Sequence, residues 1–547
     1  MSSSNAVFNG RRRVPPATND PIRSYAPGSP ERASLKARLK TMASESIDIP
    51  LIIGGKEVHT GSCGKSVMPH DHQHVLGHYH KASESHVLQA VDAARTAWND
   101  WTSWSFDDRA AVILKAAELL RTSWRDVING ATMLGQSKTA FQAEIDAACE
   151  IVDFWRFNVH YGQELLDEQP LSDNTMWNQV EYRGLEGFVY AVTPFNFTSI
   201  AANLPTAPAL MGNTVVWKPA SSAMFNAYYL MKLYEEAGMP PGVINMVAGD
   251  SAMISKILLS HRDLAGVHFT GSTEVFNDMW KTIGSSMGSY RSYPRIVGET
   301  GGKDFILAHP SADADAFAVA AVRGGYEFQG QKCSAASRLY VPKSLWNGVR
   351  DRMVAMIDDI KMGDVQDFRN FMGAVIDKKS FDKISEYIAY AKQSAKIVAG
   401  GQCDASKGFF IRPTLVETAD PAYRLLCEEI FGPVLTVHVY DDAKWAETMK
   451  IVDTTSPYAL TGAVFAQDRR AIVEATSVLR HAAGNFYVND KPTGAVVGMQ
   501  PFGGARASGT NDKAGSKLNL IRWVSARTIK ENFAPPKDYK YPFMGQE

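Results

Sequence analysis

Two hydrophobic patterns alternate along the chain, and the first is helical. Between residues 83 and 161, apolar side chains recur three and four positions apart, as in Val87, Ala90, Val91 and Ala94. This spacing places them on one face of a helix, so the segment is predicted to be mainly helical. Residues 144–157 are predicted to form a further amphipathic helix within it.

The second pattern consists of short apolar runs separated by helical segments. Runs of four or five residues follow Gly187, at 188–192, 214–217, 243–247 and 266–269. Runs this short and this apolar suit strands that are buried on both faces. Residues 223–237 are predicted to form a helix that ends at Gly238. The order strand, helix, strand predicts a parallel α/β sheet.

A second α/β series is predicted from 305 to 489, with strands at 338–341 and 460–465. Two segments fit neither series, 179–183 and the tail from 517 onward, and we expect them to form extra strands that pair between subunits. The first forty residues are polar and rich in Pro, Ser and Arg, which indicates an arm lying on another surface rather than a domain.

Charge and cysteine content narrow the class of protein. Lys and Arg number 57 against 58 acidic residues, which argues against a nucleic-acid partner or an anionic membrane surface. No apolar run approaches the roughly 18 residues that span a bilayer. The five cysteines include no CxxC pair, so we predict neither a metal site nor a disulfide framework. Few thiols in so long a chain are typical of a reducing compartment.

The first residues carry a weak targeting signal. The arginines at 11–13 stand among serines with no acidic residue before Asp20, as in transit peptides. Pro15 and Pro16 interrupt any amphipathic helix there, so a cleaved leader is not favoured. We expect a cytoplasmic location for a bacterial protein and the mitochondrial matrix for a eukaryotic one.

Cys333 is the candidate nucleophile. It stands in FQGQKCSA at 328–335, a glycine-containing turn between a predicted helix and a predicted strand. The thiolate is the nucleophilic form of cysteine, and the adjacent cation of Lys332 is expected to lower the thiol pKa. The alternative is that Cys333 is a small, buried apolar residue.

Further polar groups lie at the ends of predicted strands. In GETGGK at 298–303, glycines permit close backbone approach and Glu299 can act as a general base, the alternative being a turn with a solvated glutamate. FTGSTE at 269–274 opens a helix whose N–H groups suit a phosphate. Lys218, at the end of a predicted strand, can reach a ribose or a phosphate, and the alternative is that its side chain is solvated. The side-chain amide of Asn196 can donate to an oxyanion.

In this order the segments resemble the aldehyde dehydrogenase superfamily. The matching motifs are PFNF at 194–197, VVWKPA at 215–220, FTGSTE, GETGGK, GQKCSA at 330–335, EEIFGPV at 428–434 and QPFGG at 500–504. The resemblance implies an α/β, aldehyde dehydrogenase-like fold with a Rossmann-like NAD-binding domain at 35–164 and 187–307 and an α/β catalytic domain at 308–498. It also implies an N-terminal arm at 1–34 and a small β oligomerisation flap at 165–186 and 517–547, so we expect a homodimer or a higher homo-oligomer.

The resemblance assigns chemical roles to these motifs. Cys333 would attack an aldehyde carbonyl to give a thiohemiacetal, whose oxyanion is held by Asn196 and the Cys333 N–H. Hydride transfer to NAD leaves a thioester, which water activated by Glu299 hydrolyses. Relatives that pass the acyl group to coenzyme A lack a glutamate at this position, so hydrolysis is expected. The residues expected to bind NAD are Thr193, Lys218, Gly271, Ser272, Thr273, Glu274, Val275, Glu429 and Phe431.

Within the superfamily, the chain most resembles the enzymes that oxidise L-glutamate γ-semialdehyde, the second step of proline degradation. The stretches that carry this likeness are 28–32, 143–148, 182–187, 489–491 and 500–513. The resemblance implies that the substrate carboxylate binds the N–H groups of Gly494 and Ala495, beside Ser334. Phe197 and Phe502 would flank the aliphatic chain, with core packing as the alternative for both. Glu150 and Lys332 would complete the substrate pocket.

Other functions remain to be weighed against this one. A cysteine hydrolase or acyltransferase needs a histidine to activate the thiol, and His268 and His309 are the candidates. An inactive relative is disfavoured because Cys333, Asn196 and Glu299 are all present. A broad-specificity aldehyde dehydrogenase is the main competing interpretation.

Overall fold

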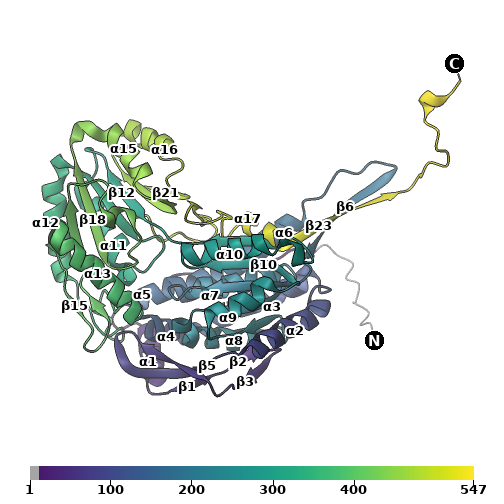
Figure 1. Cartoon of the computed structure of the whole chain (residues 1–547), viewed down its shortest axis with the longest axis horizontal. Coiled ribbons are helices and arrows are strands. Elements are labelled where there is room, and N and C mark those ends of the chain that lie inside the picture. The colour runs from purple at the N-terminus through teal and green to yellow at the C-terminus, as the bar shows by residue number, and fades with distance from the viewer. Residues whose placement is uncertain (1–11, 547) are drawn as a thin grey trace.

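The structure is a computed structural model that describes residues 12–546. The part of the predicted arm before residue 12 lies outside the described residues. The chain forms two α/β units with a β-ribbon that projects from the first (Figure 1). Among the described residues, no helix is long and apolar enough to cross a membrane.

The first unit contains a seven-stranded sheet in the order β11-β10-β7-β8-β9-β2-β3. Its parallel strands are β7 (Phe188–Thr193), β8 (Thr214–Pro219), β9 (Ile244–Met246), β10 (Leu264–Thr270) and β11 (Arg295–Glu299). β2 (Leu51–Ile53) and β3 (Lys56–Val58) extend it in antiparallel pairing. The four predicted strands after Gly187 are therefore confirmed.

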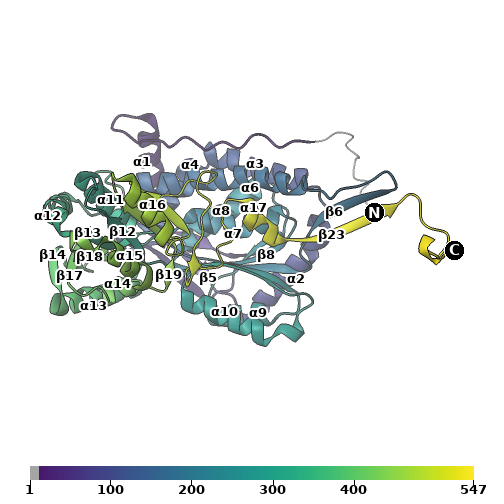
Figure 2. The ribbon, with the colours of Figure 1, turned by 90° about the horizontal axis from the view of Figure 1, so that it is seen from above.

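Helices cover both faces of this sheet (Figure 2). α7 (Thr198–Leu210) lies on one face, and outside it pack α3 (Phe106–Arg121), α6 (Ile151–Leu166) and α8 (Met224–Ala237). α2 (Glu84–Trp101) and α9 (Ser251–Ser260) cover the other face, with α10 (Thr273–Ser285) against α9. The predicted helix at 223–237 is confirmed, and Gly238 ends it at φ 91°.

The last part of the helical stretch before the sheet contains a π-helix. α4 (Arg125–Gln136) is followed by α5 (Ala140–Ala143), a π-helix at Glu144–Glu150 and then α6. The predicted helix at 144–157 is thus present, with its first half wound as a π-helix. α1 (Pro30–Ala43) packs on α4, so a helix begins inside the segment expected to be the N-terminal arm.

The second unit is built on a sheet of order β14-β17-β18-β13-β12-β20-β21, in which all strands except β14 are parallel. The strands are β12 (Asp304–Ala308), β13 (Ala336–Pro342), β14 (Lys396–Ala399), β17 (Thr414–Thr418), β18 (Val434–Tyr440), β20 (Thr461–Phe465) and β21 (Asn485–Val488). Its helices are α11 (Ala314–Tyr326), α12 (Lys343–Asp359), α13 (Lys378–Ser394), α14 (Arg424–Cys427), α15 (Trp445–Thr454) and α16 (Arg469–Val478). Since β12 belongs to this sheet, the predicted domain boundary at 307 falls inside a strand.

Smaller sheets complete the fold. β1 (Ile47–Ile49), β5 (Asp71–His80) and β4 (Cys63–Met68) form a three-stranded sheet, and the short pairs are β15 (Cys403–Asp404) with β16 (Phe410–Ile411) and β19 (Tyr458–Ala459) with β22 (Ala505–Arg506). The ribbon pairs β6 (Met176–Gly184) with β23 (Val524–Asn532), which follows α17 (Lys517–Leu520). The two segments that fitted neither series therefore do contain strands, and these strands pair with each other within one chain.

Candidate functional site

The predicted site residues gather where loops of the two sheets meet. Asn196 follows β7, Lys218 lies near the end of β8, and Glu299 ends β11. The carboxyl ends of parallel strands are where α/β sheets usually bind ligands. The Cys333 turn enters this region from the second unit, between α11 and β13.

Two contacts bring the nucleophile loop to the first unit. The Asn196 amide donates to the backbone carbonyl of Gln331 over 3.0 Å, and both side chains are buried. A Cβ built on Gly302 would lie 2.0 Å from the Cys333 carbonyl oxygen, so only glycine allows the GETGGK loop to approach this closely. The structure therefore brings the predicted nucleophile, amide donor and GETGGK loop together.

Buried amides hold the turn that presents Cys333. Phe328 and Gln329 have positive φ values of 50° and 57°. The Gln329 side chain donates to the carbonyls of Ser137 and Ala374 and accepts from the N–H of Gly373. The strained backbone is thus fixed by hydrogen bonds from the surrounding loops.

Cys333 is 9% exposed, and the pKa of its thiol is raised rather than lowered. Burial is the main cause, and the carboxyl groups of Asp304, Glu299 and Glu429 add to it. The expectation that Lys332 lowers this pKa is wrong, because the Lys332 ammonium pairs with Glu327 at 3.3 Å. Without a ligand, the sulfur therefore rests as a thiol.

Glu299 lies in a surrounding that disfavours the charged form of its carboxyl group. Its Oε2 accepts from the N–H of Gly504 over 3.0 Å. Burial raises the pKa of Glu299 well above its usual range, while the Gly504 hydrogen bond and the charge of Lys513 act in the opposite direction. The Lys513 ammonium is itself fixed by the carbonyls of Gly484 and Gly503, at 2.8 and 2.9 Å. Lys513 is the cation that favours the basic form of Glu299.

The residues predicted to bind NAD offer groups of the right chemistry. Burial lowers the pKa of Lys218 to about 8, and its ammonium donates a hydrogen bond to the carbonyl of Pro219 at 3.4 Å. Glu429 is half-buried and accepts from the N–H of Gly302 at 2.9 Å. An ammonium and a carboxyl group suit the hydroxyl groups of two riboses.

The helix predicted to face a phosphate also has the expected form. Ser272 caps the N-terminus of α10, accepting from the N–H of Val275, and Gly271 precedes it. The positive end of a helix dipole and its unpaired N–H groups favour an anion. Phe431, at φ 61°, packs edge-on against Phe195 of the PFNF motif at 5.8 Å. The remaining predicted residues, Thr193, Thr273 and Glu274, lie at the same strand and helix ends.

The substrate side of the site contains a buried ion pair that sequence reasoning missed. The Lys138 ammonium lies 2.5 Å from Asp146 and sits 4.2 Å from the ring centre of Phe197. Asp146 also accepts from the N–H groups of Thr198 and Ser199, and thereby fixes the start of α7 just after Phe197. The sequence signal was the segment at 143–148, whose acidic residues alone did not point to a lysine partner.

Glu150 lies at the end of the π-helix, close to this pair. Burial raises its pKa to about 8, and the Asp146 charge adds to the effect, so near neutral pH its carboxyl group is mainly protonated. A protonated carboxyl can donate a hydrogen bond as well as accept one.

The loop predicted to anchor a carboxylate is joined to the nucleophile loop. The hydroxyl groups of Ser334 and Thr493 are 2.9 Å apart, one residue from Cys333 and one from Gly494. Phe502 pairs with Ala514 through two backbone hydrogen bonds, so it belongs to the same group of loops. Thr493 was not among the predicted residues, since a lone threonine carries no distinctive pattern.

The histidines proposed for a cysteine hydrolase have other partners. The His268 ring contacts the carbonyl of Leu204 at 2.9 Å and packs on Trp523, and His309 contacts the Ser311 hydroxyl at 2.9 Å. Neither ring is placed to activate Cys333, so the hydrolase alternative loses its required base.

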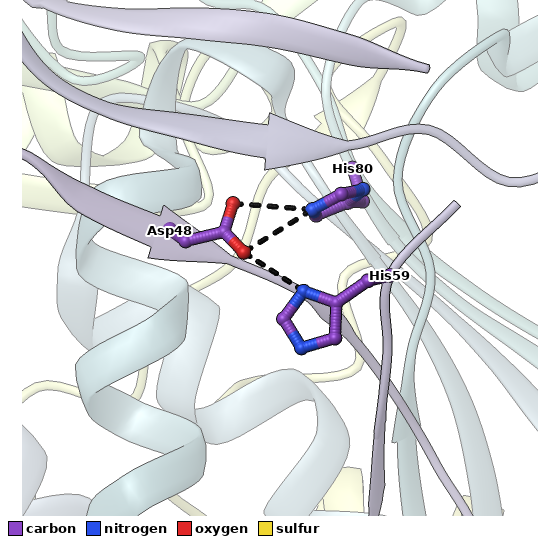
Figure 3. Close-up of side chains that lie close together, drawn as sticks. All are labelled: Asp48, His59 and His80. Carbon is purple, nitrogen blue, oxygen red and sulfur yellow. Dashed lines mark hydrogen bonds and ion pairs between the residues drawn. The ribbon is translucent and has the colours of Figure 1, made fainter. Parts of the chain in front are cut away.

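A separate cluster, Asp48, His59 and His80, lies on the small sheet and its flanking loop (Figure 3). Its potential ligand atoms lie within 4.8 Å of one another. However, His80 Nδ1 accepts from the N–H groups of Thr60 and Gly61 at 2.8 and 3.2 Å. The ring hydrogen must therefore be on Nε2, which donates to Asp48 at 3.1 Å. With both ring nitrogens engaged, His80 has no lone pair for a metal ion, and the cluster ties strands together.

Comparison with known proteins gives consistent matches. The aldehyde dehydrogenase family model matches residues 58–529. Delta-1-pyrroline-5-carboxylate dehydrogenase, mitochondrial, of Dictyostelium discoideum is 51% identical over 539 residues, covering 98% of this chain and 97% of the relative. The mouse mitochondrial enzyme of the same name is 46% identical, covering 96% and 94%. The Mycobacterium tuberculosis Delta-pyrroline-5-carboxylate dehydrogenase crystal structure bound with NAD has a TM-score of 0.95 at 51% identity, covering 98% and 100%.

The Glu299–Lys513 arrangement yields a prediction about protonation. Lys513→Met should raise the pKa of Glu299 by about one unit, because the charge that favours the ionised carboxyl is lost. Infrared difference spectra recorded across a pH series measure this pKa, with Glu299→Gln identifying the carboxyl band. Lys513→Arg retains the charge and should titrate close to the wild type. Equal midpoints in the Met variant and the wild type would contradict the prediction.

Proposed function

Because the chain belongs to the aldehyde dehydrogenase family, we propose that it oxidises L-glutamate γ-semialdehyde, the open form of Δ1-pyrroline-5-carboxylate, to L-glutamate. NAD is the hydride acceptor, and the reaction is the second step of proline degradation. The observation that carries this proposal is the 2.9 Å contact between Ser334 and Thr493, which sets the predicted carboxylate loop beside the nucleophile. Relatives that are about half identical over nearly the whole chain bear the name of this activity.

The first chemical step belongs to Cys333. Its sulfur bonds to the aldehyde carbon, and the carbonyl electron pair moves to oxygen. The Asn196 Nδ2 has two hydrogens, one of which is donated to Gln331; the second, with the Cys333 N–H, stabilises the oxyanion. Because burial favours the thiol, the sulfur loses its proton as the new bond forms.

NAD, when bound, takes up the hydride that the tetrahedral carbon gives up. Lys218 and Glu429 would hold its riboses, Gly271 and Ser272 would face the pyrophosphate, and Phe431 would flank the nicotinamide ribose. Glu299 then removes a proton from the water that attacks the thioester on Cys333. Cleavage of the carbon–sulfur bond releases the carboxylic acid and restores the thiol.

Recognition of the substrate combines an anion site with an apolar channel. The N–H groups of Gly494 and Ala495 bind the α-carboxylate whatever their side chains, and Ser334 adds a hydroxyl donor. Phe197 and Phe502 enclose the aliphatic chain. Glu150 and Lys332 lie at the pocket edge, where a protonated Glu150 avoids repelling the anionic substrate.

A substrate comparison tests the proposal. We predict that kcat/KM, measured by NADH formation, is at least about tenfold higher for pyrroline-5-carboxylate than for propanal, because propanal lacks the carboxylate that the loop binds. Glutaraldehyde, which has the chain length without the α-carboxylate, should fall between them. Cys333→Ala should abolish all three activities. Equal rates with propanal would instead indicate a broad-specificity aldehyde dehydrogenase.

A second prediction separates acylation from hydrolysis. Glu299→Gln should give a burst of one NADH per site and then a steady rate reduced about a hundredfold or more, since the thioester lacks its general base. Stopped-flow absorbance resolves the two phases. Undiminished steady turnover would exclude Glu299 as the base.

We also propose that the chain forms homodimers through the ribbon of β6 and β23. The ribbon projects from the body (Figure 1), and an isolated two-stranded ribbon is only marginally stable. Trp177 and Ile529 on the ribbon and Phe533 just beyond it are 52%, 37% and 59% exposed. An exposed strand edge with apolar side chains is a typical site of association.

A charge placed on the ribbon tests the dimer. Trp177→Asp combined with Phe533→Asp should shift the protein to monomers at micromolar concentration in sedimentation velocity, because carboxylates would be buried at the interface. Leu88→Asp changes an exposed leucine on α2, outside the ribbon, and should leave the assembly intact. A double variant that sediments as the wild type would contradict the proposal.

The names of two relatives bear on the cellular location of the protein. The eukaryotic relatives compared above carry "mitochondrial" in their names. For a eukaryotic source we propose the mitochondrial matrix, and for a bacterial source the cytoplasm.

A further inference from the structure

The N-terminal segment is tied into the first unit by a buried polar network. Residues 12–29 run along the outer helices α4 and α6 (Figure 2). Asp20 is 5% exposed, and its carboxylate pairs with Arg125 at 2.5 Å and Arg156 at 3.3 Å. Arg125 also pairs with Glu144, which accepts from the Tyr25 hydroxyl at 2.8 Å. Ion pairs this deeply buried require fixed geometry, so the segment has a defined position.

Asn19, in this segment, bridges two distant parts of the chain. Its Nδ2 donates to Asp153 of α6 and to the backbone carbonyl of Val497, both at 2.8 Å. The second oxygen of Asp153 accepts from the N–H of Asp20 at 2.7 Å. Asn19 thus joins α6 to the loop that begins at Gly494.

The loop is attached at Thr493 and at Val497, and Gly494 and Val496 between them are exposed. At one end, Thr493 contacts Ser334 beside the nucleophile. At the other, Val497 is 6% exposed and bonded to Asn19, whereas Met499 is 63% exposed. The N–H groups of Gly494 and Ala495 lie between these two attachments, so their direction depends on both.

We propose that Asn19 is a positioning residue for the substrate carboxylate, acting through the Val497 carbonyl on the N–H groups of Gly494 and Ala495. This inference rests on the proposed function, since it assumes that the loop binds the carboxylate. Asn19 does not touch the reacting atoms. It restricts the loop to the geometry in which two backbone donors converge, and small displacements of such donors weaken binding strongly.

The expected effect is selective for the substrate. In Asn19→Ala, the preference for pyrroline-5-carboxylate over propanal, expressed as a ratio of kcat/KM values, should fall about tenfold, since a hydrogen bond to the loop is lost and Asp153 loses a partner. The loss should appear in the KM for pyrroline-5-carboxylate, with kcat changed less than twofold. The parameters for propanal, which has no carboxylate, should also change less than twofold.

Two control variants separate positioning from general stability. Thr18→Ala alters the exposed neighbouring side chain and should keep the wild-type ratio. Gln163→Ala removes a side chain that accepts from the Val14 N–H and donates to the Arg12 carbonyl, which loosens the start of the segment and leaves the partners of Asn19 in place; it should lower the thermal midpoint and keep the ratio. An Asn19→Ala enzyme with the wild-type ratio, or a Gln163→Ala enzyme with an equal loss of preference, would overturn the inference. A wild-type enzyme without any preference would refute the proposed function itself, which is measured first.

Discussion

The candidate site depends on one close backbone contact, between Gly302 and the carbonyl of Cys333. The GETGGK loop leaves β11 of the first sheet and enters β12 of the second, so it is a covalent link between the two units. A side chain at residue 302 would occupy the space of the Cys333 carbonyl oxygen, 2.0 Å from the Cβ position. Because the same loop begins with Glu299 and its Gly302 N–H binds Glu429, its position sets the base, the nucleophile and a cofactor residue relative to one another.

Around this contact, burial disfavours the charged forms of the acidic groups. Burial raises the pKa values of Cys333, Glu299 and Asp304, and the carboxyl groups of Asp304 and Glu299 raise that of Cys333 further. An ionised Glu299 therefore disfavours the thiolate form of Cys333. The oxidation of an aldehyde needs them at different times, the thiolate for attack and the carboxylate for hydrolysis, so their mutual repulsion is compatible with the order of the proposed steps.

The sequence predicted the strands and motifs well because each depends on local patterns. The apolar runs at 188–192 and 214–217 are β7 and β8, and the helix ending at Gly238 is α8. The roles of isolated polar residues were harder to predict from the sequence. Lys332 is adjacent to Cys333 in the chain, yet its charge is satisfied by Glu327, and only the fold reveals this pairing. Lys138 and Lys513 affect the site through contacts that neither periodicity nor spacing encodes.

The difference between local patterns and isolated polar contacts also explains why the N-terminal segment was only partly predicted. Its composition predicts an arm, because few apolar residues are present to form a core. Composition does not predict that Asp20 and Asn19 belong to a buried hydrogen-bond network, since single polar residues in a polar segment carry no periodic signal. The contact from Asn19 to Val497 spans 478 positions, and its geometry is set by α6, which presents Asp153 to the same amide. A segment that appears peripheral in the sequence thus lies against the loop on which the proposed recognition of the substrate carboxylate depends.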